Sequence, residues 1–375
     1  LSRSVPGGDS APGASSSFPQ VLGYLGREQP DREVEPLLEA LDVGPESFDT
    51  LVALGNLMRR KGAVDRAIGI HQNLVDHPQL EIRQQHRAYL ELARDFQKAV
   101  LLDRAEGILV DLIAVSAELR PMALAFLLDL YDEEREWEKA IAIGEQWLAT
   151  GAAKTDFERE KTARRVAHYC CEKAQEAHRA GQLKQARQYV RRAFSFDRDC
   201  FRAGMIQAQI REQQGSARRA VEVLQRVVNA HPRLLLVALP QLRRLYQEYG
   251  ELAGFHQFLR KHLDNHRSAA ATLDLARDLE RLESPEVAAS FLERTLQRHP
   301  SLRGVARLIE LQCACGQLRP SPVLTALGEQ IDQVLASRAV YCCEHCGFSG
   351  RTLHWQCLSC KQWGCVVPVV GVLGE

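Results

Sequence analysis

Between Phe18 and roughly Ser337, apolar residues recur at the three- and four-residue spacing of amphipathic helices. No segment of this region alternates convincingly between apolar and polar residues with the two-residue period of a strand. The pattern therefore predicts that residues 18–337 are all α-helical. Residues 1–17, LSRSVPGGDSAPGASSS, are instead rich in Gly, Pro, Ser and Ala. They carry too little apolar surface to offset the entropy of ordering, so we expect a flexible linker.

The predicted helices form pairs, and the pairs repeat along the chain. In the stretch LGNLMRRKGAVDRAIGIHQNLVDHP, Gly62 ends one helix, Ala67 lies where the next helix crosses it, and Pro78 closes the unit. A small residue is needed at the crossing because the two helices approach most closely there. The same place is taken along the chain by Ala67, Ala105, Ala140, Ala186, Ala220, Phe255 and Ala288.

The spacing of these crossing residues resembles that of the tetratricopeptide repeat, whose period is about 34 residues. Subtraction of the residue numbers gives steps of 38, 35, 46, 34, 35 and 33. The step of 46 implies about eleven extra residues relative to its neighbours, which we expect in a lengthened helix pair around residues 155–169. The earlier stretch FPQVLGYLGREQPDREVEPLLEAL fits one more unit, with Glu33 in the crossing place. Such repeats stack into a right-handed superhelix, and its concave groove binds peptides or protein surfaces.

Four cysteines near the C-terminus point to a metal site. Cys343, Cys346, Cys357 and Cys360 form two C-x-x-C pairs within the stretch CEHCGFSGRTLHWQCLSC, and this spacing is typical of a tetrahedral thiolate site. The segment 338–375 is too short for a core of its own, so we expect a metal ion to hold it together as a small ribbon. Four thiolates suit either Zn or a single Fe ion, and they leave no coordination position for water or substrate.

Other residues of the ribbon are expected to surround this site. Cys342 and Cys365 flank the four cysteines, and Cys343 suits the C-x-x-C geometry better than its neighbour Cys342 does. The aromatic residues are expected to cover the metal site and to dock the ribbon on the last helices, with ligand stacking as the alternative; they are Tyr341, Phe348, Trp355 and Trp363.

The charge balance argues against a nucleic-acid partner. The 375 residues contain 48 Lys and Arg and 48 Asp and Glu. From Tyr341 onward the ribbon carries two charges of each sign, whereas a nucleic-acid-binding ribbon should be basic. Paired arginines are spread along the helices, and we expect them to form a solvated polar face, with an anionic binding track as the alternative. The pairs are Arg59/Arg60, Arg164/Arg165, Arg191/Arg192, Arg218/Arg219 and Arg243/Arg244.

The sequence gives no sign of catalysis or of a membrane span. It contains no G-x-S-x-G, no phosphate-binding Gly-rich loop and no H-E-x-x-H motif, so we predict a protein that is not an enzyme. No uninterrupted apolar run approaches the ~18 residues that a membrane helix needs. Eleven cysteines in a chain of this length favour a reducing compartment. The cysteines outside the ribbon are expected to be small buried residues: Cys170, Cys171, Cys200, Cys313 and Cys315.

The order of the two parts resembles the lipopolysaccharide assembly protein B family of Gram-negative bacteria. The resemblance covers nearly all of the chain after about residue 18 and rests on degenerate repeats, one containing LGNLMRRKGAVDRAIGIHQNL, followed by YCCEHCGFSGRTLHWQCLSCKQW. It implies that the ribbon is rubredoxin-like and that the family's four metal cysteines correspond to Cys343, Cys346, Cys357 and Cys360. The expected fold is thus an all-α tetratricopeptide-repeat solenoid with a small rubredoxin-like metal ribbon.

The resemblance also implies a function. The family acts as an adaptor on the cytoplasmic face of the inner membrane, where it couples a membrane AAA protease to the deacetylase of the lipid A pathway and works with other lipopolysaccharide assembly proteins. Its members carry an N-terminal membrane helix, which does not occur in this sequence, so we expect membrane attachment only through an anchor outside these residues and a soluble chain otherwise. A homodimer is an open alternative to the monomer.

Two rival functions remain at this stage. A rubredoxin-like FeS4 centre can cycle one electron, which would make the protein an electron carrier fused to a scaffold. The second rival is an RNA- or DNA-binding ribbon protein, which the neutral charge of the ribbon disfavours.

Overall fold

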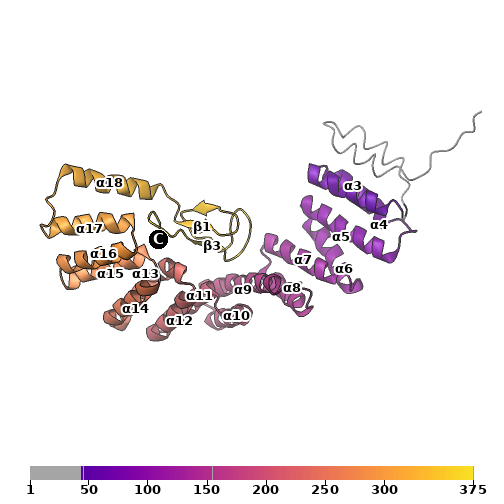
Figure 1. Cartoon of the computed structure of the whole chain (residues 1–375). Helices are drawn as coiled ribbons and strands as arrows, with labels where there is room; N and C mark the ends of the chain where they lie inside the picture. Colours follow the sequence, from indigo (N-terminus) through magenta and orange to yellow (C-terminus); the bar gives the residue numbers. More distant parts are fainter. Residues whose placement is uncertain (1–43, 45, 154, 375) are drawn as a thin grey trace, which may run out of the picture. The chain divides into compact units, whose positions relative to one another are not determined.

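The computed structural model describes residues 44, 46–153 and 155–374, and these residues form two compact units, one ending at Glu134 and the other beginning at Arg135. The predicted linker and the extra repeat with Glu33 lie outside the described residues. The first unit contains five helices among its described residues (Figure 1): α3 (Phe48–Lys61), α4 (Val64–Val75), α5 (Ile82–Lys98), α6 (Leu102–Val115) and α7 (Arg120–Glu134).

The second unit continues the helical hairpins and ends in a small sheet. Its helices are α8 (Trp137–Ala149), α9 (Asp156–Arg179), α10 (Leu183–Phe196), α11 (Phe201–Gln213), α12 (Ala217–Ala230), the short 3-10 helix η1 (Pro232–Leu234), α13 (Leu235–Tyr249), α14 (Leu252–Asn265), α15 (Ala269–Leu282), α16 (Pro285–Arg298), α17 (Leu302–Ala314) and α18 (Pro322–Ala336). The strands are β1 (Tyr341–Cys343), β2 (Ser349–Gly350) and β3 (Val366–Pro368). The predicted fold class, a helical-repeat protein with a C-terminal cysteine ribbon, is confirmed.

The crossing residues lie where the repeat pattern placed them. All six alanines and Phe255 have no exposed surface, because each faces the neighbouring helix at its point of closest approach. Gly62 follows α3 with a φ of +86°, and Gly250 follows α13 with a φ of +75°. Glycine adopts this left-handed conformation without the steric penalty of a Cβ atom, which allows the chain to turn sharply into the next helix.

The lengthened helix pair is also present. Helix α9 spans 24 residues, and the Thr155 side chain caps its first turn by accepting a hydrogen bond from the backbone N–H of Glu158. The extra turns carry Arg164 and His168, which lie close to Gly364 of the ribbon. The insertion between Ala140 and Ala186 therefore supplies part of the surface on which the ribbon is seated.

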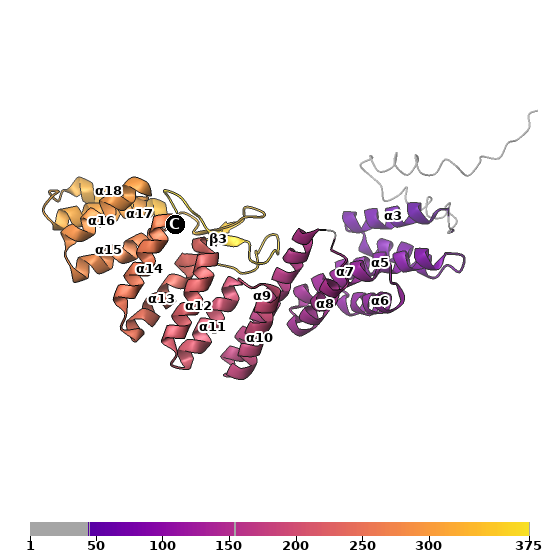
Figure 2. The ribbon, with the colours of Figure 1, turned by 60° about the horizontal axis from the view of Figure 1, so that its bottom comes forward.

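The ribbon is a three-stranded antiparallel sheet with the order β2-β1-β3. Figures 1 and 2 show it lying alongside the helices from α9 to α13. The expectation that its aromatic residues dock on the last helices is therefore wrong for Trp355 and Trp363, which contact α8, α9 and α11. The chain reverses after α18 and runs back along the second unit (Figure 1). The end of the ribbon contacts α17, where the carbonyl of Val372 accepts a hydrogen bond from the N–H of Leu302.

Two further expectations need correction. Cys313 and Cys315 are half-exposed, unlike the buried Cys170, Cys171 and Cys200, because they lie at the end of α17. The paired arginines do not form one solvated face either. Arg59 and Arg243, each the first member of its pair, form ion pairs with two carboxylates of a neighbouring helix.

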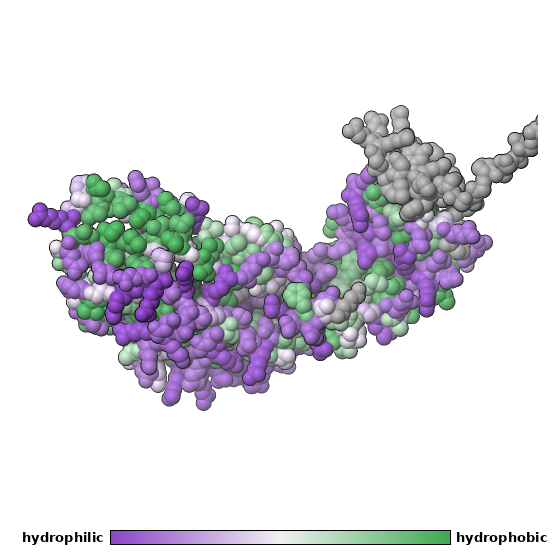
Figure 3. All heavy atoms as spheres, in the orientation of Figure 1, coloured by the Kyte–Doolittle hydropathy of each residue, from purple (hydrophilic) through white to green (hydrophobic). Residues whose placement is uncertain are grey.

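The last helices of the second unit carry an apolar surface. Figure 3 shows apolar side chains gathered over α17 and α18, and Val305, Val323, Leu327 and Val334 are exposed there. The end helix of a repeat stack usually presents a polar outer face. Helix α18 departs from that rule.

Candidate metal centre

The two C-x-x-C segments fold as matching turns. In the first, the backbone N–H of Cys343 donates to the carbonyl of Phe348 over 2.8 Å. In the second, the N–H of Cys357 donates to the carbonyl of Gln362 over the same distance. Both hydrogen bonds join a residue to the fifth one after it, so the two segments present their cysteines in the same way.

The residue after each C-x-x-C segment has a left-handed backbone. Gly347 has a φ of +76° and Lys361 a φ of +57°, and each donates its N–H to the carbonyl four residues earlier, at Cys343 and Cys357. Glycine adopts this conformation without strain, whereas for lysine it costs about 1 kcal/mol of conformational free energy. The surrounding structure therefore holds Lys361 in a backbone conformation that lysine disfavours.

These turns bring together the four cysteines named from the sequence. The Sγ atoms of Cys343 and Cys360 are 3.7 Å apart, and those of Cys346 and Cys357 are 3.6 Å apart. All four sulfurs lie within 4.8 Å of one another, as a metal site requires. Metal–sulfur bonds of about 2.3 Å in a tetrahedron place sulfurs ~3.8 Å apart. The donor set therefore fits one Zn or Fe ion.

The surroundings of the thiols favour metal capture. A hydrogen bond from the backbone N–H of Phe348 lowers the pKa of Cys346 to about 6, so this exposed residue is a thiolate near neutral pH. Burial opposes ionisation of Cys343, but backbone N–H groups of Cys346 and His345 outweigh it and lower the pKa. Burial raises the pKa of Cys360 to about 11. Metal ions bind thiolates, so the lowered pKa values of Cys343 and Cys346 favour metal binding by the first turn.

The two flanking cysteines have different positions. The Sγ of Cys365 lies 3.4 Å from that of Cys343, and burial raises the pKa of Cys365 well above its usual range. It is therefore a protonated thiol beside the site, and it donates a hydrogen bond to the backbone carbonyl of Gln362 over 3.3 Å. The Sγ of Cys342 lies 3.7 Å from each of the backbone carbonyl oxygens of Cys343 and Gly347. Neither residue belongs to the set of four.

A cluster of aromatic rings seats the ribbon on the helices. Trp363 stacks on His168 with ring centres 5.3 Å apart, and it meets Trp137 and Tyr169 edge-on at 5.9 and 5.7 Å. Its side chain is 6% exposed. Edge-to-face and offset pairs at these distances stabilise packing beyond the area they bury. Trp363 thus joins the ribbon to α8 and α9.

The backbone of the ribbon also approaches the helices closely. A Cβ atom at Gly364 would lie 2.9 Å from Nε2 of His168, and Gly364 has a φ of +66°. Glycine is required there for both reasons. Burial, together with the charges of Arg202 and Arg164, lowers the pKa of His168 to about 3. His168 is therefore neutral beneath the ribbon.

Polar contacts complete the seat. The guanidinium of Arg202 is 5.8 Å from the centre of the Trp355 ring and pairs with Glu172 of α9. Arg233 of η1 forms an ion pair with Glu344, between the two cysteines of the first turn. The sequence motifs gave no reason to single out His168 or Arg202. The unusually long repeat step between Ala140 and Ala186 was a signal for His168 of α9, but it does not include Arg202 of α11.

The fold and the cysteine site define a class, the tetratricopeptide-repeat proteins that carry a four-cysteine ribbon after the last helix. Within this class, the chain belongs to the lipopolysaccharide assembly protein B family. It is 30% identical to lipopolysaccharide assembly protein B of Escherichia coli (strain K12) over 98% of this chain and 92% of the relative. The protein of that name from Haemophilus influenzae is 28% identical over 95% and 90%.

Comparison with solved structures returns repeat proteins of low similarity. A structure of the MamA protein has a TM-score of 0.35 at 15% identity and covers 50% of this chain and 94% of that chain. A tetratricopeptide repeat protein from Parabacteroides merdae also has a TM-score of 0.35, at 14% identity over 71% and 98%. No protein-family model matches the sequence. Among the described residues, no helix is long and apolar enough to cross a membrane.

Proposed function

We propose that this protein is a non-catalytic adaptor that regulates lipopolysaccharide synthesis. Its repeats would bind partner proteins, and its ribbon would complete the surface of the second unit. Membership of the lipopolysaccharide assembly protein B family supports the pathway. The observation that carries the adaptor role is the seating of the cysteine ribbon on α8, α9 and α11 through Trp363 and Trp355. The seat makes the metal site part of a binding platform.

In this proposal, Cys343, Cys346, Cys357 and Cys360 hold one Zn or Fe ion. The bound ion crosslinks the two turns, which contain too few apolar residues to form a core. With four thiolates around it, the ion has no open position at which water or a substrate could bind. The role of the metal is therefore to fix the shape of the ribbon.

The partners in the proposal are a membrane AAA protease and the deacetylase of the lipid A pathway, with other lipopolysaccharide assembly proteins. The protein would work at the cytoplasmic face of the inner membrane, reached through an anchor outside the described residues. It would bring the deacetylase to the protease and so set the rate of lipopolysaccharide synthesis. Self-association as a homodimer is a further expectation, which sedimentation velocity on the purified chain tests.

Replacing Cys357 and Cys360 with Ser tests the proposal. We expect the variant to lose its metal ion, as measured by elemental analysis. We also expect the deacetylase level in cells to be no longer regulated, as measured by immunoblotting. The double variant Cys313→Ser/Cys315→Ser removes two half-exposed cysteines at the end of α17 and is the matched control. Normal deacetylase control by a metal-free protein would remove the ribbon from the mechanism. An absorption spectrum of the anaerobically purified protein separates Fe from Zn and tests the electron-carrier alternative.

A further inference from the structure

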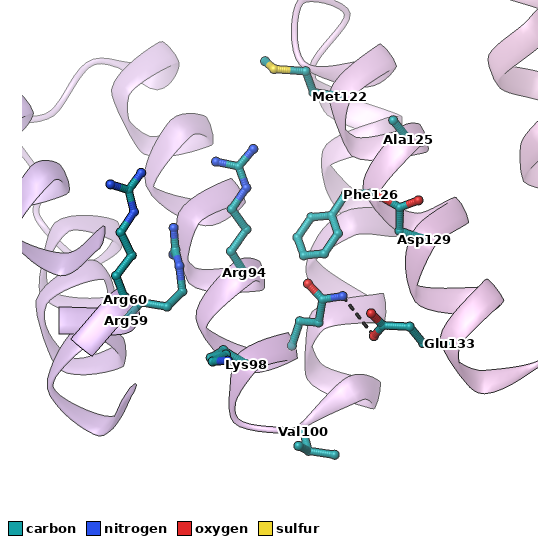
Figure 4. A pocket seen from close by; sticks show the side chains of 11 residues that line it. Arg59, Arg60, Arg94, Lys98, Val100, Met122, Ala125, Phe126, Asp129 and Glu133 are labelled. Carbon is teal, nitrogen blue, oxygen red and sulfur yellow. Dashed lines mark hydrogen bonds between the residues drawn. The ribbon is translucent and has the colours of Figure 1, made fainter. Parts of the chain in front are cut away.

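An open groove in the first unit has no role in the metal site. It has a volume of about 930 Å³ and is lined by α3, α5, the turn after α5, and α7. These three helices are alternate members of the repeat, so they share one side of the stack. Figure 4 shows side chains from the three helices facing the same space.

One wall of the groove is cationic. Arg60 and Lys98 are exposed, and neither forms an ion pair with any residue that the structure describes. Arg94 pairs with Glu91 through one nitrogen, but its side chain is still 42% exposed. Figure 4 shows Arg94 and Arg60 extending in the same direction along the groove. Three positive side chains are therefore available to a ligand on the side of α3 and α5.

The neighbouring Arg59 plays a different part. It donates to Asp95 and to Glu91, each over 2.8 Å, and its side chain is 17% exposed. These bonds attach α3 to α5 and hold the cationic wall in position. Arg59 is thus a structural residue of the groove, and the ligand-facing charge comes from the other three cations.

The opposite wall, on α7, is apolar with an acidic end. Phe126 projects into the groove, and Met122 beside it is 48% exposed. Farther along α7, Glu133 accepts a hydrogen bond from Gln97 over 3.1 Å, and Asp129 lines the same end. An acidic ligand group is therefore repelled from this end of α7 and attracted to the wall formed by α3 and α5.

We infer that this groove binds a protein segment that combines acidic side chains with a Leu-, Met- or Phe-type residue. The acidic groups face Arg60, Arg94 and Lys98, and the apolar residue packs on Phe126 and Met122. A small molecule is a poorer match, because such ligands prefer enclosed cavities, whereas this groove is open and has one cationic wall. The inference deepens the proposed adaptor function and rests on it for its biological meaning.

Peptide binding to the purified full chain tests the inference. The probe is a fluorescent 12-residue peptide of Gly, Ser, four Glu and two Leu, about the length that fits one groove. In one comparison peptide Gln replaces Glu, and in another Ser replaces Leu. Fluorescence anisotropy should detect binding of the first peptide that weakens as salt is added. Both comparison peptides should bind at least about tenfold more weakly, since each loses one kind of contact.

Variants of the protein locate the binding. The double variant Arg60→Glu/Lys98→Glu should weaken binding of the acidic peptide by at least about tenfold, because it turns attraction into repulsion. Phe126→Ala should weaken it to a similar extent through lost apolar contact. The matched control is Lys184→Glu/Arg219→Glu, which makes the same charge change at exposed residues of the second unit and should leave the affinity within about twofold.

Three results would overturn the inference. The first is that the acidic Leu-containing peptide does not bind. The second is that the Ser-substituted peptide binds as tightly as the Leu-containing one. The third is that the control variant weakens binding as much as Arg60→Glu/Lys98→Glu does. Equal binding of the Ser-substituted peptide would indicate a general polyanion site, open to nucleic acid as well. The assay needs neither the protease nor the deacetylase, and the cysteine experiment does not involve the groove. A negative result for the groove therefore leaves the proposed adaptor function untouched, and a negative result in the cysteine experiment leaves the groove inference untouched.

Discussion

At the scale of single residues, buried ion-pair clusters connect neighbouring repeats. In the first unit, Asp95 accepts a hydrogen bond from Arg59 over 2.8 Å, and its other oxygen lies 2.5 Å from Nδ1 of His71. The side chains of Asp95 and His71 have no exposed surface. Arg59 and Asp95 are 36 residues apart, close to one repeat, so the cluster fixes the register of one helix pair on the next.

The second unit repeats this arrangement, which permits a matched test. Arg243 donates two hydrogen bonds of 2.9 Å to Asp278, and Nε2 of His256 lies 2.8 Å from the same carboxylate. Removing the charge in Arg243→Ala leaves Asp278 buried without its cation, at a cost of about 2–3 kcal/mol in the free energy of unfolding. The adjacent Arg244 pairs with Glu212 at the surface, with 56% of its side chain exposed. Arg244→Ala should cost less than about 1 kcal/mol, and equal urea midpoints for the two variants would contradict this account.

His168 gives the seat of the ribbon a pH dependence. Its pKa is about 3 when folded, against an ordinary value of 6.5. Between these values the unfolded chain binds a proton that the folded chain does not, so the free energy of unfolding falls as pH falls, by up to about 1.4 kcal/mol per pH unit. His168→Phe keeps a ring beside Trp363 and should show a shallower slope between pH 6.5 and 4 in denaturant titrations. Identical slopes for the two proteins would exclude His168 as the source.

At the scale of elements, the extra length of α9 provides part of the surface on which the ribbon packs. The extra residues between Ala140 and Ala186 were predictable from the repeat spacing, and α9 is the long helix that contains them. Their contact with the ribbon was not predictable, because the packing of Trp363 on α9 depends on the path of the chain after α18. A repeat pattern describes neighbours in sequence, whereas this contact joins elements far apart in the chain.

Trp363→Ala separates the docking of the ribbon from its metal binding. Loss of a buried tryptophan costs about 3–5 kcal/mol, so the ribbon should detach from α8 and α9 while its four cysteines keep the metal ion. We expect one metal ion per chain by elemental analysis and at least about 100-fold faster proteolysis between α18 and β1. Phe348→Ala removes an aromatic residue of the ribbon that is 36% exposed and should change neither quantity. Loss of the metal from Trp363→Ala would show that docking and metal binding are one event.

At the scale of the whole molecule, the described residues form two compact units, and each contains a cluster of buried apolar residues. One core includes Phe48, Leu54 and Leu74 of the first unit, and another extends from Phe201 to Leu311 in the second. Repeat proteins are stabilised mainly by contacts between neighbouring repeats. We therefore expect a perturbation of one unit to act mainly on the repeats of that unit.

Metal removal should distinguish the two units. The ribbon is seated on the second unit, so a chelator that removes the ion should lower the unfolding temperature of that unit by several degrees. The first unit should keep its unfolding temperature, as measured by differential scanning calorimetry of the full chain. A single transition that shifts as a whole would mean that the two units unfold together. Cys357→Ser/Cys360→Ser without chelator should reproduce the shift.

The sequence by itself determined the helical repeats and the group of four cysteines. Both are local patterns: a helix follows from apolar residues three and four apart, and a C-x-x-C turn places two thiols within a few residues. The crossing alanines were likewise readable, since one small residue per repeat reports the closest approach of adjacent helices.

Only the tertiary structure decided which residues contact the ribbon and which charged side chains remain exposed to a ligand. Arg59 and Arg60 are neighbours in sequence, yet the first is tied to Asp95 of α5 and the second is exposed at the groove. Arg233 and Glu344 are paired across 111 residues. Such contacts depend on how distant segments pack, and burial then changes the energy of each charge, so residues of one type acquire different roles.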